Sequence, residues 1–104
     1  MDIKTFKVVG VTVHARHGPT GHQHDFHVEV VMAMAKKDEW IELSIEQGLL
    51  MGQLKRISTD GMATDFGNMN IKEIAEKALS FDIRIVEARV YERYPFAGVI
   101  ARKA

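Results

Sequence analysis

The segment 22–35 alternates between two sets of side chains, and this alternation limits the folds open to the chain more than any other feature. Successive residues of a β-strand point to opposite faces, so the pattern predicts a strand. The preceding segment 3–14 is rich in β-branched residues and also predicts a strand, with Gly10 as a candidate bulge. A turn at 17–21 joins the two, so we expect a long hairpin. One face of its second strand carries His22, His24, Phe26, Val28, Val30, Met32 and Met34, and the other carries Gln23, Asp25, His27 and Glu29.

The middle of the chain predicts two helices. The segment Ser44–Ile57 carries one apolar stripe, and its Ser44 and Gln47 have the spacing of a capping box, in which side chains satisfy the free N–H groups of the first turn. The segment 69–80 follows the helical apolar period closely, with Asn68 or Asn70 as its N-cap.

Two further strands follow the helices. The segment 82–93 alternates as a strand, Tyr94–Pro95 forms a turn, and 96–103 is the last strand. The order strand–strand–helix–helix–strand–strand predicts an α+β fold, in which two helices cover one face of a four-stranded antiparallel sheet. The length of 104 residues suits a single domain over residues 1–104.

Composition excludes several classes of function. Lys and Arg number 14, as do Asp and Glu, and this balance argues against nucleic-acid or membrane partners, which need a basic excess. The absence of cysteine excludes disulfides, thiolate metal sites and cysteine nucleophiles. No apolar run approaches the roughly 20 residues that cross a bilayer, and no signal peptide is evident, so we expect a cytoplasmic protein. A chain this short buries a modest fraction of its surface, which favours self-association.

All 5 histidines lie between residues 14 and 27. His22 and His24 are two apart on a predicted strand and therefore share a face, and His14 lies across the turn near the end of the preceding strand. Three converging imidazoles are a suitable set for zinc, with a fourth position open to water or substrate. His17, in the turn, is either a base or a bystander. The plainer alternative is that the histidines alternate along a half-exposed strand without binding metal.

Two carboxylates are further candidates. Asp65 lies in the glycine-flanked segment 61–67, where it can orient a histidine or a water, or simply cap a turn. Glu92 ends an apolar strand face, where a carboxylate can accept paired N–H bonds from a guanidine-like edge. The alternative for Glu92 is an exposed ion pair with Arg89, Arg93 or Arg102.

Several segments resemble one family in order along the chain. Residues His22–Val30 (HQHDFHVEV) are similar to the zinc-binding strand of the 6-pyruvoyl-tetrahydropterin and 6-carboxy-tetrahydropterin synthases, H-G-H-N-Y-x-V-x-V. Val11–His14 resembles the strand before it, Gly61–Gly67 (GMATDFG) the family's G-M-V-x-D-F-G, and Val90–Glu92 its V-x-E.

This resemblance implies a tunnelling fold (T-fold) and lyase chemistry on a pterin side chain at the interfaces of a homo-oligomeric ring. It implies zinc held by His14, His22 and His24, and a pterin ring anchored by Glu92. The catalytic cysteine of the family has no counterpart, and no histidine follows His27. The remaining candidates for proton transfer are His17 and Asp65.

A second family of the same fold also fits. Gly10–Gly18 (GVTVHARHG) is similar to the G-L-x-x-x-A-x-H-G stretch of dihydroneopterin aldolase, which needs no zinc. The lysine that precedes the proline in that enzyme is here Arg93 or Tyr94. A third alternative is a non-catalytic T-fold protein that binds a heterocycle, which the missing cysteine favours.

Overall fold

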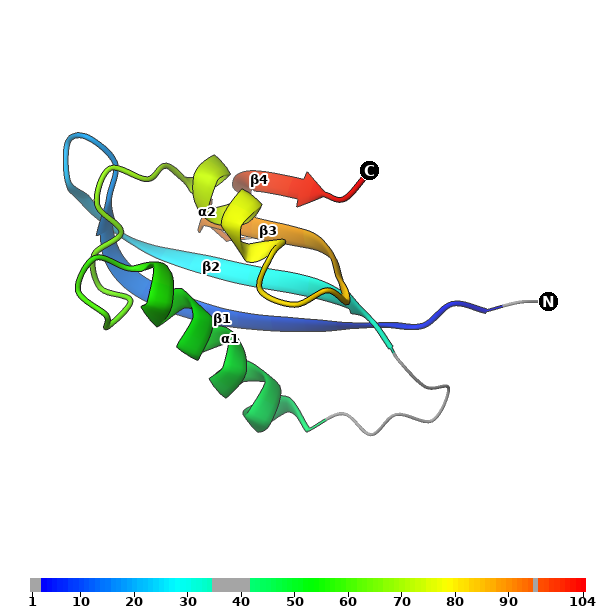
Figure 1. Cartoon of the computed structure of the whole chain (residues 1–104). Helices are drawn as coiled ribbons and strands as arrows, with labels where there is room; N and C mark the ends of the chain where they lie inside the picture. The colour runs from blue at the N-terminus through cyan, green and yellow to red at the C-terminus, as the bar shows by residue number, and fades with distance from the viewer. Residues whose placement is uncertain (1–2, 35–41, 95) are drawn as a thin grey trace.

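Within the part of the chain that the structure describes, four strands and two helices follow one another in the predicted order (Figure 1). A computed structural model describes residues 3–34, 42–94 and 96–104, apart from the side chains of His22 and Leu43. The predicted strand end at Ala35 and the turn residue Pro95 lie outside the described residues. The elements are β1 (Phe6–His17), β2 (His22–Ala33), α1 (Leu43–Ile57), α2 (Ile71–Ala78), β3 (Ile85–Arg93) and β4 (Ala97–Arg102).

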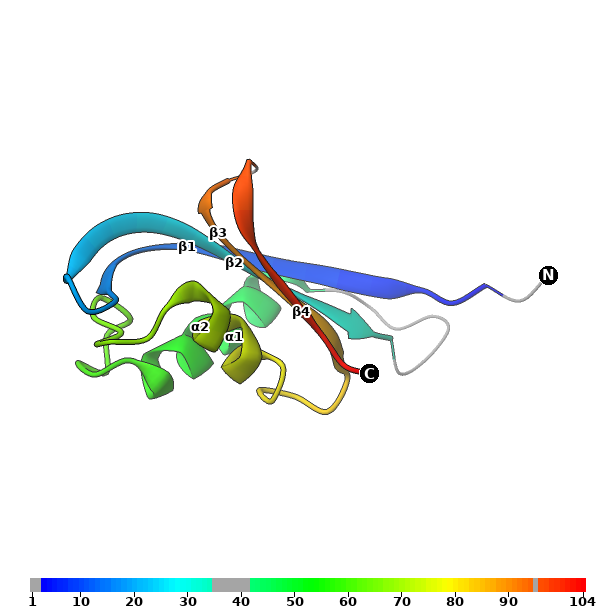
Figure 2. The ribbon, with the colours of Figure 1, turned by 90° about the horizontal axis from the view of Figure 1, so that it is seen from above.

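The strands form one antiparallel sheet in the order β1-β2-β3-β4, and both helices lie on the same side of it (Figure 2). Helix α1 packs against β1, and α2 packs against β3 and β4. The predicted α+β class and element order are therefore confirmed. Among the described residues, no helix is long and apolar enough to cross a bilayer. The largest fully buried side chains, which form the centre of the core, are those of Phe26, Phe66, Leu54, Ile74, Val9, Val28 and Val90.

The β1–β2 hairpin extends further toward its turn than the sequence predicts. Pairing runs without a break from Phe6–Ala33 to His17–His22, so His17 belongs to the strand and only residues 18–21 remain for the turn. Gly18 and Gly21, with φ of 81° and 66°, allow this tight reversal. The predicted bulge at Gly10 is wrong, because Gly10 pairs with Glu29 in the continuous register.

The two helices begin differently. The predicted capping box of α1 is not formed: the N-cap residue is Glu42, without a side-chain cap, and Gln47 Nε2 donates instead to the Gly10 carbonyl, 2.9 Å away. In α2, Asn70 Oδ1 accepts from the Glu73 N–H at 2.9 Å, and the Glu73 carboxylate accepts from the Asn70 N–H in return. Asn70 is thus the N-cap, as one of the two predicted alternatives has it.

Candidate metal centre

His17 is a buried residue at the end of β1, and 6% of its surface is exposed. Counting by two from Val9 through Val13 reaches His17, so its imidazole lies on the helix-covered face with the core. Its ring packs edge-on against Phe26, with centroids 5.5 Å apart. The sequence placed His17 in the turn; the continuous register of the hairpin places it inside the sheet.

Two other side chains meet His17, one from the adjacent strand β2 and one from β3 beyond it. His24 of β2 brings its ring centroid to 5.3 Å from that of His17, and Glu92 of β3 brings Oε1 to 3.1 Å from His17 Nε2. One ligand atom from each of the three residues lies within 4.8 Å of the others. Glu92 is positioned by a bulge, because β3 pairs with β4 through Tyr91 and Arg93 and leaves Glu92 without a partner between them.

The ring nitrogens of His17 are both buried, and neither finds a hydrogen-bond partner within the described part of the chain. The contact with Glu92 has the distance of an ion pair but not the direction of a hydrogen bond. A buried polar group left without a partner costs about 1–3 kcal/mol. Such a cost is common where a site is completed by a ligand, an ion or a proton.

The group of His17, His24 and Glu92 can hold a metal ion. Two imidazoles and one carboxylate are a ligand set that zinc uses in catalytic sites, with a fourth position left open. Ligand atoms around a tetrahedral zinc stand roughly 3.3 Å apart, so the contact between His17 and Glu92 already has this spacing. Glu92, with 36% of its side chain exposed, leaves the group accessible from outside.

Two members of the predicted ligand set of His14, His22 and His24 lie on opposite faces of the sheet: His14 on one and His24 on the other. His14 pairs with Asp25 across the hairpin, and its Nδ1 lies 2.6 Å from Asp25 Oδ1 on the exposed face of the sheet. His24 pairs with Ala15, which is buried on the other face. His14 is therefore corrected to a surface residue on the face opposite His24, and the side chain of His22 lies outside the described residues.

Asp65 has the simpler of its two predicted roles within the described residues. Its Oδ1 accepts from the Gly67 N–H at 2.8 Å and so closes a turn. The same loop is fastened to β1, because the Arg16 N–H donates to the Thr64 carbonyl and the Phe66 N–H donates to the Arg16 carbonyl. The loop thus abuts the residue before His17, although Asp65 is not part of the three-residue group.

The alternative ion pairs of Glu92 are formed by another carboxylate. Arg89 and Arg102 both donate to Glu87, and Arg89 also donates to Glu29. Among the ion pairs of the described residues, Glu92 pairs with His17. Glu92 is therefore directed toward His17. Because Arg89 and Arg102 pair with Glu87 instead, an ion pair with either of them does not account for the position of Glu92.

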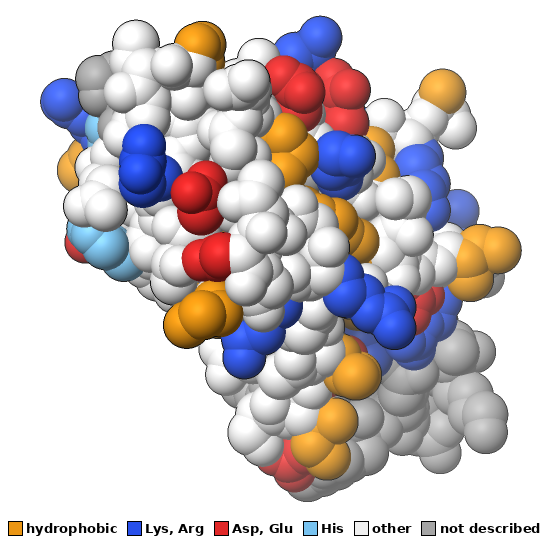
Figure 3. All heavy atoms as spheres, turned by 60° about the vertical axis from the view of Figure 1, so that its left-hand side comes forward, with side chains coloured by type: hydrophobic (Ala, Val, Ile, Leu, Met, Phe, Trp, Pro, Cys, Tyr) orange, Lys and Arg blue, Asp and Glu red, His pale blue; other side chains and the backbone are white. Residues whose placement is uncertain are grey.

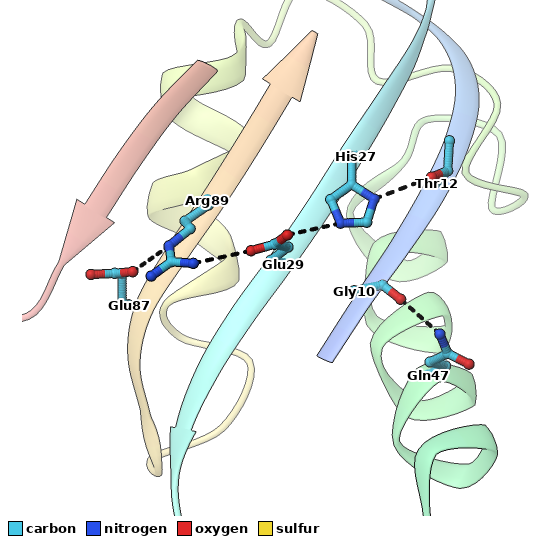
Figure 4. Close-up of polar contacts among 7 residues, drawn as sticks. All are labelled: Gly10, Thr12, His27, Glu29, Gln47, Glu87 and Arg89. Atoms are coloured by element: carbon cyan, nitrogen blue, oxygen red, sulfur yellow. Dashed lines mark hydrogen bonds and ion pairs between the residues drawn. The ribbon is translucent and has the colours of Figure 1, made fainter. Parts of the chain in front are cut away.

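The sequence analysis did not predict a polar network that lies on the uncovered face of the sheet. The imidazole of His27 lies between Thr12 and Glu29, with both hydrogen bonds 3.1 Å long, and Arg89 continues the chain to Glu87 (Figure 4). The sequence feature that could have predicted this network is the alternate polar residues of β2, which face away from the core. His27 thus lies on the opposite face from His24, as its position in the strand predicts.

The surface at the hairpin end carries exposed histidine, acidic, basic and apolar side chains in a mixture (Figure 3). Neither charge sign forms a continuous field in this view, in keeping with the formal net charge of zero. No known protein-family profile matches the chain, and no curated protein sequence matches it either. The site geometry therefore carries the functional argument.

Proposed function

We propose that this chain is a subunit of a homo-oligomeric T-fold enzyme, a zinc-dependent lyase that acts on the side chain of a pterin-like heterocycle. The observation that supports it best is the group of His17, His24 and Glu92, in which neither ring nitrogen of the buried His17 has a hydrogen-bond partner among the described residues. The element order and the family-like segments, two of which contain members of this group, support the same proposal.

His17, His24 and Glu92 would hold the zinc, in place of the three histidines that the resemblance implies. When bound, zinc supplies Lewis-acid polarisation of a side-chain oxygen. The surrounding protein excludes water on one side, where Phe26 packs against His17 and Phe66 packs against Phe26. Glu92 then has two competing roles, ligand and ring anchor, since one carboxylate oxygen already faces His17. Titration with a pterin is needed to test the role of Glu92 as ring anchor.

A metal-free aldolase is the second candidate, and the contact of His17 with Glu92 favours it. A histidine beside a carboxylate can take and return a proton without metal, since the carboxylate stabilises the charged imidazole. The third candidate is a binding protein without catalysis, favoured by the missing cysteine. In each case we propose a closed ring of at least four copies, because the edge strands β1 and β4 are open to pairing.

The first experiment measures metal and ligand together. Protein purified without chelator is analysed for zinc, and neopterin is titrated into it by calorimetry with and without metal. The proposal expects near-stoichiometric zinc and neopterin binding. Neopterin binding by a protein that stays metal-free after zinc is supplied favours the aldolase-like or binding-only candidates. Absence of neopterin binding in both forms removes the pterin proposal. Sedimentation of a stable monomer at micromolar concentration contradicts the ring.

A further inference from the structure

A hydroxyl, an imidazole and a carboxylate follow one another on the uncovered face of the sheet (Figure 4). Thr12 Oγ1 of β1 lies 3.1 Å from His27 Nδ1 of β2, and His27 Nε2 lies 3.1 Å from Glu29 Oε1. Thr12 and His27 are cross-strand partners in the hairpin, and His27 and Glu29 are two apart on one strand, so the three side chains share a face. Their contacts are those of a nucleophile, a base and a group that orients the base.

The carboxylate determines which nitrogen of His27 carries the proton. An ionised carboxylate only accepts hydrogen bonds, and Glu29 already accepts one through Oε2 from Arg89 Nη1, 3.2 Å away. The hydrogen bond between Glu29 Oε1 and the neutral His27 ring therefore needs the proton on Nε2. This leaves Nδ1 with a lone pair, so the Thr12 hydroxyl donates to it. A base with a free lone pair thus faces the hydroxyl whose proton it would take.

Two neighbours hold the imidazole in this orientation. A Cβ at Gly10 would lie 2.8 Å from His27 Nε2, so the ring fits over β1 because this residue has no side chain. The ring of Tyr94 packs on the imidazole with centroids 4.4 Å apart. The side chains of His27 and Glu29 are 19% and 11% exposed, whereas Thr12 is an exposed residue. The base is therefore fixed and largely covered, while the hydroxyl is open to a substrate.

We propose that Thr12 and His27, positioned by Glu29, form a separate catalytic site that hydrolyses activated aryl esters through an acyl intermediate on Thr12. Thr12 Oγ1 bonds to the acyl carbon while its proton passes to His27 Nδ1, and Glu29 stabilises the imidazolium. The bond from the acyl carbon to the aryl oxygen breaks, and Nδ1 gives the proton to that oxygen. Water then attacks the acyl carbon and loses a proton to Nδ1, which returns it to the departing oxygen of Thr12.

Aryl esters suit this arrangement for two reasons. Phenolates leave readily, so the reaction demands less stabilisation of the charge on the carbonyl oxygen than amide hydrolysis does. Tyr94, which is 57% exposed and packs beside His27, gives an aryl group an aromatic surface next to the reacting atoms. The site is independent of the proposed metal centre, since His24 lies on the other face of the sheet and none of these residues belongs to that group.

The orientation of His27 can be read by nitrogen-15 NMR of the full chain. In mildly alkaline buffer the imidazole proton should lie on Nε2. Glu29→Gln replaces an acceptor by an amide that can also donate, so the variant should populate the form with the proton on Nδ1. Release of 4-nitrophenolate from 4-nitrophenyl acetate should then fall at least about tenfold. A proton on Nδ1 in the wild type, or an unchanged tautomer and rate in Glu29→Gln, would overturn the role of Glu29 and with it the site.

The nucleophile is tested by variants and by covalent labelling. Thr12→Ser should keep the esterase activity, whereas Thr12→Val, whose branched shape suits a strand, should lower it at least about tenfold. Thr20→Val, in the exposed turn, is the matched control and should leave the rate unchanged. Phenylmethanesulfonyl fluoride should transfer its sulfonyl group to Thr12 Oγ1 with loss of fluoride, as mass spectrometry of peptides would show.

Two results would overturn the proposal: equal rates in Thr12→Val and Thr20→Val, or a sulfonyl label confined to lysine and tyrosine side chains. Zinc content and neopterin binding should be the same in Thr12→Val as in the wild type, because Thr12 lies on the face opposite His24. Failure of this site is therefore distinguishable from failure of the proposed enzyme.

Discussion

The Nε2 atom of His17 lies 3.1 Å from a carboxylate oxygen of Glu92, and yet neither nitrogen of His17 makes a hydrogen bond within the described residues. The two residues come from non-adjacent strands and meet above Phe26, against which the His17 ring packs. A protein interior seldom leaves such a group unpaired, and the penalty is offset where a ligand completes the site. A substitution at His17 that abolishes metal binding should therefore not lower the stability of the metal-free protein.

His17→Phe should show this directly. The phenyl ring keeps the packing and removes two buried unsatisfied nitrogens, so the free energy of unfolding of the metal-free protein should stay level or rise by about 1 kcal/mol. Zinc binding should be lost. The control is His27→Phe, which removes hydrogen bonds to Thr12 and Glu29 and should cost about 1–3 kcal/mol. Urea unfolding in the presence of chelator measures both, and equal losses in the two variants contradict the argument.

An alanine scan of the histidines should separate the two faces of the hairpin. His17→Ala and His24→Ala each remove a proposed ligand and should weaken zinc binding by at least about 100-fold. His14→Ala and His27→Ala alter the opposite face and should change it by less than about threefold. Competition with a zinc-binding dye gives the four affinities. A large loss in His14→Ala would restore the ligand set that the family resemblance implies.

The element order was predictable because each segment has a clear period. Alternation identified β2 and β3, β-branched residues identified β1, and the apolar stripe that begins at Ile71, after the N-cap Asn70, identified α2. The prediction for His14 was wrong because it did not consider which face of the strand His14 lies on. The buried residues of β1, such as Val9 and Val13, all have odd numbers, and His14 does not. Because the side-chain period of a strand is two, this assigns His14 and His17 to opposite faces.

The meeting of Glu92 with His17 was not predictable as a contact. It depends on the order of strands in the sheet and on the irregular pairing between Tyr91 and Arg93, which no local pattern encodes. The role of Gly10 was equally hidden. A glycine in a strand predicts a bulge, whereas here it leaves room for a side chain from β2.

Gly10→Ala tests that role. A Cβ at Gly10 would lie 2.8 Å from His27 Nε2 and 3.3 Å from Glu29 Cγ, so the imidazole must move away from its hydrogen-bond partners. We expect a loss of about 1–3 kcal/mol in the free energy of unfolding. Gly52→Ala is the control, because open space surrounds that position in α1 and alanine is the better helix former, which should add up to about 1 kcal/mol. Equal effects in urea unfolding would contradict the contact.

The two helix N-termini offer a paired test of capping. Asn70→Ala removes the side chain that accepts from Glu73 N–H, so the free energy of unfolding should fall by about 1 kcal/mol. Ser44→Ala should change it little, since within the described residues Ser44 Oγ donates to the exposed Glu42 carboxylate and caps no backbone group. Thermal unfolding measures both. A larger loss in Ser44→Ala would restore the capping box predicted for α1.

Glu87 should make the stability of the protein depend on pH in the acid range. Its side chain is 11% exposed, and hydrogen bonds from Arg102 and then Arg89 hold the pKa of its carboxyl below the ordinary value of 4.5. The unfolded chain therefore takes up the proton at a higher pH than the folded protein does. The stabilisation is fully present above pH 4.5 and is lost as the pH falls through the lowered folded pKa.

Glu87→Gln removes this charge while keeping the shape of the side chain. At pH 7 the variant should unfold with a free energy lower by about 1–3 kcal/mol, because two charge-assisted hydrogen bonds are weakened. The difference between wild type and variant should narrow as the pH is lowered from 5 to 3, since protonated Glu87 and glutamine become equivalent toward Arg89 and Arg102. Glu76→Gln, which alters an exposed pair with Lys72, should show almost no difference at any pH. A gap for Glu87→Gln that stays constant from pH 7 to 3 would mean that its carboxyl titrates alike in both states, contrary to the lowered pKa.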